Sequence, residues 1–123
     1  DEVATETCTF VTLDSYVEKK VINPADIMYI WADVQCHEIE VVEGALETLK
    51  QSPASLFIEY NIDYHKQNPG NIERFVGMLS KIYKSFICYE QYEMGMKMTR
   101  KINELIKVSD ELDCSFCNIL LIK

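Results

Sequence analysis

Residues 27–34, with the sequence IMYIWADV, constrain the fold of this chain more than any other segment. The run is apolar almost without interruption up to Asp33. A strand with one wet face alternates apolar and polar residues, whereas a strand buried on both faces of a parallel sheet is apolar throughout. The segment therefore predicts a central strand of a layered α/β sheet, with neighbours on both edges.

The elements around this strand alternate in type. Residues 37–51 place Ile39, Val42, Leu46 and Leu49 at helical spacing, so they predict one amphipathic helix with an acidic start. The other predicted elements are a β-prone stretch over 7–13, a helix over 15–21 capped by Asp14, a strand over 55–61, a helix over 72–86, a helical pattern over 102–108 and a closing strand over 116–123. This order predicts an α/β layer in a single domain, residues 1–123.

Composition excludes some classes of function. The net charge of -8 argues against nucleic acid as a partner, because a phosphate backbone needs clustered Lys and Arg. No apolar stretch is long enough to span a membrane. Five cysteines cannot all pair within one chain and no signal-peptide pattern is present, which favours a reducing cytoplasm. The first residue is Asp rather than Met, so we expect a processed chain or an excerpt of a longer one.

The chain also resembles a known family. The strings VTLDSYVEKK, MYIWADVQCHEIEVVEGALETL, SLFIEYN and CNILLIK are similar to the C-terminal half of the FkbM-like S-adenosylmethionine-dependent methyltransferases. In that family a TLD segment precedes a strand that ends in a D-V/I-Q/E-G-x-E motif, and the residues that fit this pattern are Asp33, Val34, Gln35, His37, Glu38, Val42, Gly44 and Ala45. The resemblance implies a partial Rossmann-like fold of the class I methyltransferase type: a mostly parallel sheet with flanking helices that lacks the N-terminal cofactor-binding half.

The chain departs from the family at two points. Cys36 stands where the family usually has glycine, which bears on the tight turn after the strand. No glycine occurs before Gly44, so the Gly-rich cofactor loop is not encoded in this chain. We therefore expect S-adenosylmethionine to bind the isolated chain weakly or not at all, and whether the chain is an active enzyme stays open.

Candidate site residues follow from the resemblance and from sheet geometry. The resemblance implies that Asp33 and Gln35 contact the cofactor and that Asp33, His37 and Glu38 are catalytic. Ligands of open parallel sheets bind outside the carboxyl ends of the strands, so Asp33 and Glu59 should face one rim. Glu59, together with His65 from the loop that follows, is expected to bind a small-molecule acceptor that carries a hydroxyl group.

Each assignment has a purely structural alternative. Asp33 would then cap the following turn, His37 would be a partly exposed residue of the first helical turn, and Glu59 would pair with a neighbouring Lys. His65 would lie at the surface. These alternatives stay open on sequence alone.

Two further motifs resemble parts of metal sites, but each lacks the remaining ligands. The string HEIEV has Val41 where a metalloprotease helix needs its second His. Cys114 and Cys117 form a CxxC motif, but no second ligand pair with zinc spacing accompanies it. Two thiols beside a core strand is the preferred interpretation, and a thiol redox role is a weaker one.

Two functions remain in competition. The first is a methyltransferase, with O-methyl transfer expected, for which this chain supplies the substrate-side half. The second is a non-catalytic half-domain that pairs with itself or with a partner. Because the strand over 27–34 needs a neighbour on each edge, we expect a homodimer, an upstream half, or repair of that edge by residues 7–13.

Overall fold

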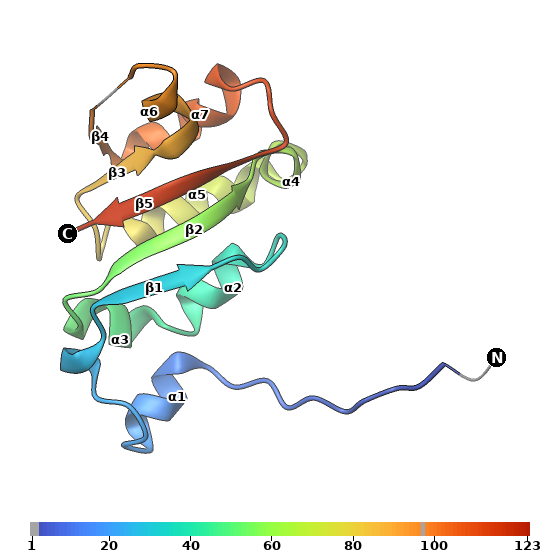
Figure 1. Cartoon of the computed structure of the whole chain (residues 1–123), viewed down its shortest axis with the longest axis vertical. Helices are drawn as coiled ribbons and strands as arrows, with labels where there is room; N and C mark the ends of the chain where they lie inside the picture. The colour runs from blue at the N-terminus through green and yellow to red at the C-terminus, as the bar shows by residue number, and fades with distance from the viewer. Residues whose placement is uncertain (1–2, 97) are drawn as a thin grey trace.

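The computed structural model describes residues 3–96 and 98–123, and its centre is a five-stranded sheet of order β1-β2-β5-β3-β4 (Figure 1). The strands are β1 (Tyr29–Ala32), β2 (Ser55–Asn61), β3 (Ser85–Cys88), β4 (Arg100–Lys101) and β5 (Phe116–Ile122). The helices are α1 (Leu13–Glu18), α2 (Glu38–Glu43), α3 (Leu46–Gln51), α4 (Ile62–Gln67), α5 (Pro69–Leu79), α6 (Tyr89–Glu93) and α7 (Leu105–Glu111). No helix in these described residues is long and apolar enough to cross a membrane.

The sheet is mixed, and the prediction of a mostly parallel sheet is confirmed only for one pair. Strands β1 and β2 are parallel, whereas β2–β5, β3–β5 and β3–β4 are antiparallel. The reason is the position of β5, which runs against its neighbours and is inserted between β2 and β3. Strands β1, β2 and β3 consequently point the same way, although β3 contacts neither of the other two.

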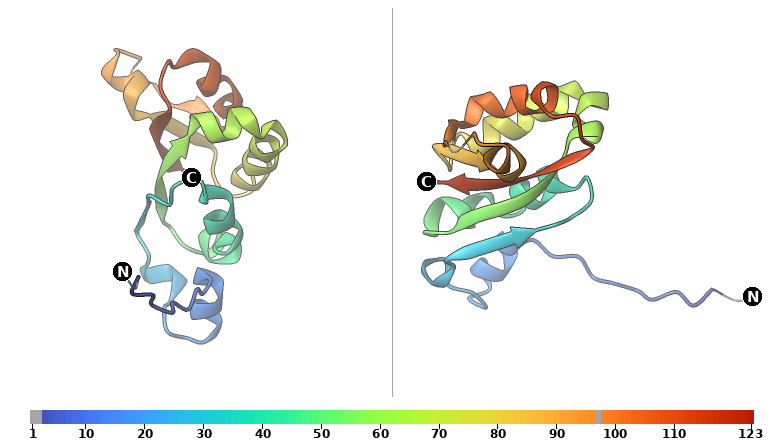
Figure 2. Two further views of the ribbon diagram at one scale, coloured as in Figure 1. Left: turned by 90° about the vertical axis from the view of Figure 1, so that its right-hand side faces the viewer. Right: turned by 45° about the horizontal axis from the view of Figure 1, so that its top comes forward.

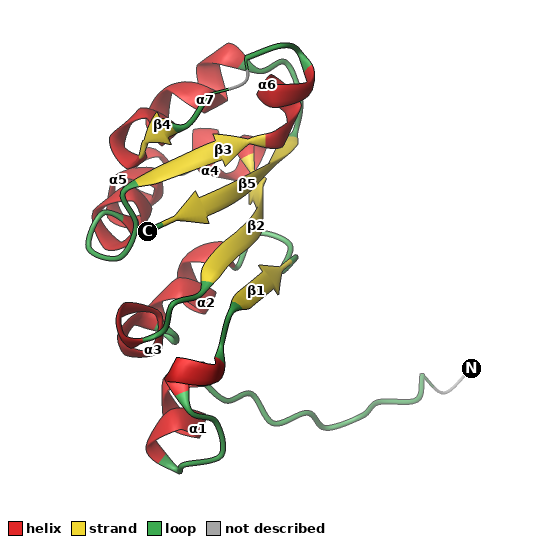
Figure 3. Ribbon diagram, turned by 60° about the vertical axis from the view of Figure 1, so that its left-hand side comes forward, coloured by secondary structure: helices red, strands yellow, loops and turns green. Residues whose placement is uncertain are grey.

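Strand β1 is outermost, so the prediction of a central strand is wrong. It pairs with β2 on one edge (Figure 3). The exposed fractions of Tyr29 and Trp31 are 50% and 70%. Successive side chains of a strand point to opposite faces. Ala32 is therefore buried on the helix side, while Trp31 lies on the open face and contacts the Phe57 ring at a centroid distance of 5.1 Å.

The N-terminal segment does not repair this edge. Residues 3–12 form no strand, and Phe10 is 94% exposed. Figure 2 shows this segment extending away from the sheet rather than along β1. The β-prone pattern over 7–13 therefore gave a wrong prediction, because an isolated strand without a partner has no hydrogen bonds to hold it.

The core lies between one face of the sheet and the helices. Strand β2 alternates buried and half-buried side chains, with Leu56, Ile58 and Tyr60 on the buried face. Phe75 and Leu79 of α5 are fully buried against this face. Figure 2 shows α2, α3, α4 and α5 gathered on the same side of the sheet. The opposite face of β2, which carries Phe57 and Glu59, is only half-buried.

The TLD segment joins α1 to the following helices. Thr12, not Asp14 as predicted, caps α1, because its Oγ1 accepts a hydrogen bond from the Ser15 amide (3.1 Å). Asp14 instead caps α3: its Oδ1 accepts from the Thr48 amide (2.8 Å) and hydroxyl (2.6 Å). The single helix predicted over 37–51 is therefore two helices, separated at Gly44.

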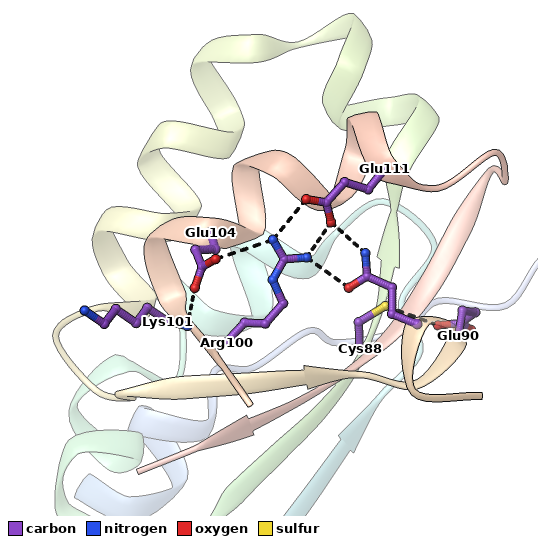
Figure 4. A network of polar contacts seen from close by, with 7 residues as sticks. Cys88, Glu90, Arg100, Lys101, Glu104 and Glu111 are labelled. Atoms are coloured by element: carbon purple, nitrogen blue, oxygen red, sulfur yellow. Dashed lines mark hydrogen bonds and ion pairs between the residues drawn. The ribbon is translucent and has the colours of Figure 1, made fainter. Parts of the chain in front are cut away.

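A charged network holds the far edge of the sheet (Figure 4). The Arg100 guanidinium, 9% exposed, makes a bidentate pair with the Glu111 carboxylate and donates to the Gln91 side-chain oxygen (3.0 Å). The pairing lowers the pKa of Glu111, chiefly through its hydrogen bonds from Arg100. Because Arg100 belongs to β4 and Glu111 ends α7, the network fixes α7 against the sheet edge.

Candidate functional site

Three polar side chains meet where the two parallel strands end. The side-chain amide nitrogen of Gln35, Nε2, donates to Asp33 Oδ1 (2.8 Å) and to Glu59 Oε1 (3.3 Å). Asp33 follows β1 directly and Glu59 lies near the end of β2. One neutral amide thus lies between two carboxylates that would otherwise repel each other. We call Asp33, Gln35 and Glu59 the acidic rim.

The turn after β1 adopts a conformation that favours glycine. Gln35 has a φ of 47° and Cys36 a φ of 75°, both in the left-handed region. For a residue with a Cβ atom this conformation costs roughly 1–2 kcal/mol. The family pattern has glycine at the position of Cys36, so the sequence departure does not remove the tight turn but makes it strained. The left-handed turn is what aims the Gln35 side chain back at Asp33.

A buried acid–base pair lies beneath this turn. Glu38 and His65 are each 1% exposed, and Glu38 Oε2 is 3.8 Å from His65 Nε2. Glu38 Oε1 accepts a hydrogen bond from the Cys36 amide (3.3 Å), so the buried carboxyl group also holds the strained turn. Three buried polar atoms of the pair have no hydrogen-bond partner among the described residues: Glu38 Oε2, His65 Nδ1 and His65 Nε2.

Aromatic rings enclose the imidazole. His65 stacks on Tyr60 at a centroid distance of 4.5 Å and on Phe75 at 5.8 Å, and the Tyr64 ring meets it edge-on at 5.4 Å. Asn61 starts α4 by accepting a hydrogen bond from the Tyr64 amide (2.9 Å), which turns the next residue, His65, inward. The predicted surface loop is therefore a short helix whose histidine belongs to the core.

Burial moves both members of the pair toward their neutral forms. Desolvation raises the pKa of Glu38 above its usual range, and backbone hydrogen bonds oppose this only in part. Desolvation lowers the pKa of His65 to about 4. A separation of 3.8 Å is too long for a hydrogen bond, and an imidazole with a pKa of about 4 is neutral near neutral pH, so the pair is not an ion pair there.

His37 lies apart from Glu38, although the two are adjacent in sequence. Its side chain is 74% exposed and its Nδ1 is 3.8 Å from Glu40 Oε2. His37, Glu40 and Asp33 line a groove of about 950 Å³ along the open edge of β1. The groove walls are otherwise mostly apolar, with Ile30, Trp31, Val41, Leu49, Leu56 and the N-terminal residues Phe10–Leu13 among them.

The structure thus divides the predicted site residues into three groups. Asp33, Gln35 and Glu59 meet at the rim; Glu38 and His65 meet in the core; His37 faces the groove. The roles of these residues stay predictions. Sequence reasoning missed the aromatic stack around His65, and the only signal for it was the apolar period of 72–79, which places Phe75 on the buried face of α5.

Comparison with known proteins identifies the family of this chain. Residues 2–94 match the family described as Methyltransferase FkbM domain, which is most of the 123-residue chain. No curated protein and no solved structure matches. The chain belongs to the FkbM methyltransferase family.

The family implies S-adenosylmethionine, and the described residues suit one part of that molecule. The sulfonium is cationic; Asp33 places a carboxylate at the wall of the apolar groove, and Gln35 links it to a second carboxylate, Glu59. The described residues offer no Gly-rich turn whose backbone amides would hold the anionic carboxylate of the cofactor. The fit is therefore limited to the acidic rim.

Proposed function

We propose that this chain forms the substrate-side portion of an S-adenosylmethionine-dependent O-methyltransferase. The observation that carries the proposal is the acidic rim at the carboxyl ends of β1 and β2, in a chain of the FkbM methyltransferase family. Ligands of α/β sheets bind at this end of the strands. The acceptor is a small molecule with a hydroxyl group.

The chemistry of methyl transfer suits the rim. S-adenosylmethionine, when bound, supplies the methyl group of its sulfonium; the hydroxyl oxygen of the acceptor forms the new bond to carbon as the carbon–sulfur bond breaks. The hydroxyl must lose its proton, and a carboxylate such as Asp33 or Glu59 accepts it as a general base. Gln35 orients both carboxylates, and orientation of reacting groups contributes roughly 7–11 kcal/mol in favourable cases.

In this proposal Glu38 and His65 act indirectly, without contacting the substrate. Each is 1% exposed, so neither touches a molecule bound at the rim in this conformation. Through the hydrogen bond from the Cys36 amide, Glu38 holds the turn that carries Gln35. We therefore propose Glu38 and His65 as positioning residues rather than as contacts to the substrate. His37, at the groove wall, is the exposed candidate for contact with the acceptor.

Backbone NMR of the isolated chain tests this proposal. We expect S-adenosylmethionine to bind with a dissociation constant in the millimolar range and to shift the amide resonances of Asp33, Gln35 and Glu59. S-adenosylhomocysteine, which lacks the positive charge, should bind several-fold more weakly, and Asp33→Asn should remove this difference. Lys84→Gln, a charge change on an exposed residue beside β3, is the matched control.

Three results would contradict the proposal. Equal binding of the charged and uncharged forms would show that the rim does not sense the sulfonium. Shifts confined to other strands would place the site elsewhere. A micromolar dissociation constant would show that the chain holds the whole cofactor without a Gly-rich turn.

A second candidate function rests on the open edge of β1. This edge exposes backbone hydrogen-bonding groups beside Trp31 and the apolar groove, an arrangement that templates pairing with another strand. Either an upstream half of the fold or a second copy of the chain would satisfy it. In the isolated chain we propose self-association through β1, which makes the chain a pairing module.

All five cysteines are free thiols, which suits a cytoplasmic location.

Sedimentation equilibrium tests the pairing. We expect a concentration-dependent dimer that Trp31→Lys dissociates, because the new charge would be buried at the pairing edge. Tyr89→Lys, at an exposed aromatic residue on α6, should leave the dimer intact. A wild-type chain that stays monomeric at about 0.5 mM would refute self-association, since this is far above the dissociation constants of specific interfaces.

A further inference from the structure

Two buried thiols and a carboxylate meet one strand beyond the acidic rim: Glu59 of the rim lies opposite Asn118 of β5, and Asn118 donates to Glu90 of this second cluster. Cys88 ends β3, Cys117 lies in β5, and Glu90 is the second residue of α6. One ligand atom from each of the three lies within 4.8 Å of the other two. Cys88 and Cys117 are 3% and 0% exposed, whereas Glu90 is half-buried and opens the cluster toward the surface.

The strand register disfavours a disulfide between the two thiols. Cys88 is directly opposite Ile119 in the antiparallel ladder, so Cys117 is its diagonal neighbour on the same face. Diagonal neighbours have Cβ atoms up to about 7–8 Å apart, and a disulfide requires about 3.5–4.5 Å. Two sulfurs that share one metal ion, at about 2.3 Å each, are separated by roughly 3.8 Å, which this register accommodates.

The third ligand is already oriented. Glu90 Oε2 accepts from the Asn118 amide (2.8 Å) and from the Cys88 thiol (3.7 Å), while Oε1 accepts from the Asn118 side chain (2.8 Å). Figure 4 shows Cys88 and Glu90 turned toward each other beside the Arg100 network. A metal-binding carboxylate held by outer hydrogen bonds is typical of protein metal sites.

The Cys114–Cys117 motif has the spacing of a zinc turn, but the sequence shows no partner pair for it. The fold uses only Cys117 of this motif, because β3 and α6 bring Cys88 and Glu90 to Cys117, whereas the exposed Cys114 thiol donates to the Phe116 carbonyl. Thiolates with one carboxylate select Zn²⁺ over hard cations such as Mg²⁺. We propose that Cys88, Glu90 and Cys117 bind one Zn²⁺ ion, with water in the fourth position, and that the ion fastens β3 and α6 to β5.

Cobalt(II) is the probe for this site, because thiolate ligands give it a charge-transfer absorption in the near ultraviolet. The full chain would be titrated under a non-thiol reductant. We expect one Co²⁺ per chain, with tetrahedral bands in the visible that Zn²⁺ displaces. The key variant replaces Cys8, Cys36 and Cys114 with Ser, which leaves Cys88 and Cys117 as the only thiols. This two-thiol variant should keep the absorption.

Loss of a ligand from the two-thiol variant should remove or weaken Co²⁺ binding. Cys117→Ser abolishes the charge-transfer band, and Glu90→Gln, at a half-buried position, weakens binding without adding a cavity. Asn118→Ala, which removes a hydrogen bond to Glu90 but no ligand, should weaken Co²⁺ binding on the order of 10- to 100-fold. Circular dichroism separates a lost ligand from a lost fold.

Zn²⁺ should also raise the melting temperature of the two-thiol variant and leave that of its Glu90→Gln form unchanged. The proposal is overturned if the two-thiol variant shows no thiolate–cobalt band, or if the band survives Glu90→Gln with unchanged affinity. It is also overturned if mild oxidation joins Cys88 to Cys117 in a disulfide found by peptide mass spectrometry, because the register argument would then be wrong.

Discussion

Replacing His65 with phenylalanine tests whether the buried imidazole is neutral and lacks a hydrogen-bond partner. His65 places beside Tyr60 and Phe75 two ring nitrogens that have no hydrogen-bond partner among the described residues, and a phenylalanine ring keeps the stack while removing both polar atoms. Leaving a buried polar group unsatisfied costs about 1–3 kcal/mol. His65→Phe should therefore raise the free energy of unfolding near neutral pH by about 1 kcal/mol, after allowance for the slightly larger ring.

The pH dependence makes the test specific. The pKa of His65 falls from 6.5 to about 4 on folding. The unfolded chain therefore binds the proton more readily, and the wild type loses stability as the pH falls through 6.5 toward 4. The complete pKa shift of His65 lowers the free energy of unfolding by about 3 kcal/mol at low pH, and about 1.3 kcal/mol of this decrease occurs between about pH 7.5 and 5.5. Glu38, whose pKa is raised on folding, affects stability in the opposite direction: its contribution to the free energy of unfolding falls as the pH rises above its pKa in the unfolded chain.

Urea denaturation followed by far-ultraviolet circular dichroism measures both effects. The stability advantage of His65→Phe over wild type should grow by about 1.3 kcal/mol between about pH 7.5 and 5.5, with the same m-value. His37→Phe is the matched control, because it makes the same substitution at a side chain that is 74% exposed rather than buried. A His65→Phe variant that is less stable than wild type at both pH values would show that the imidazole nitrogens have partners, and the interpretation of a neutral imidazole without partners would fail.

Three further substitutions test the turn and the caps by the same denaturation assay. Cys36→Gly should raise the free energy of unfolding by about 0.5–1 kcal/mol, because glycine adopts a φ of 75° without strain; a loss of stability would refute strain at that turn. Asp14→Ala should lower it by about 1–2 kcal/mol, because the Thr48 amide at the start of α3 loses its cap; an unchanged value would mean that water caps α3 equally well. Gly44→Ala should lower the free energy of unfolding by about 1 kcal/mol, because the added Cβ would lie 3.1 Å from Thr12 Cγ2. Adding Thr12→Ser, which removes Cγ2 but leaves Thr12 Cβ 3.2 Å away, should restore part of the loss; if it restores none, the contact with Cγ2 is not the cause.

Local patterns in the sequence predicted the elements well where a single strand or helix decides the outcome. The strand over 55–61 is β2 with the same bounds, the closing strand is β5, and the parallel pairing of the first two strands is present. These features depend on side-chain periodicity, which the sequence carries directly. The position of β1 in the sheet does not depend on side-chain periodicity. An apolar run has the same sequence pattern whether the edge of its strand is covered by protein or open.

Features decided by distant residues escaped prediction. The helix over 37–51 keeps its apolar period across Gly44, and what divides it is Asp14, which binds the start of α3 from a separate element. Glu38 and His65 were each named as candidates, but nothing in the sequence showed that they meet in the core. Nothing in the sequence places Cys88 near Cys117 either; the register of β3 against β5 brings them together.

The rim and the buried pair differ in how they depend on charge. Gln35 donates to carboxylates at the surface, so its hold on Asp33 and Glu59 weakens when either is protonated. The Cys36 amide donates to Glu38 Oε1, and a protonated carboxyl group still accepts a hydrogen bond at its carbonyl oxygen. The hydrogen bond from the Cys36 amide that holds the strained turn therefore persists in either protonation state of Glu38. The turn that aims Gln35 is thus held by a group whose burial keeps it out of the chemistry that occurs above it.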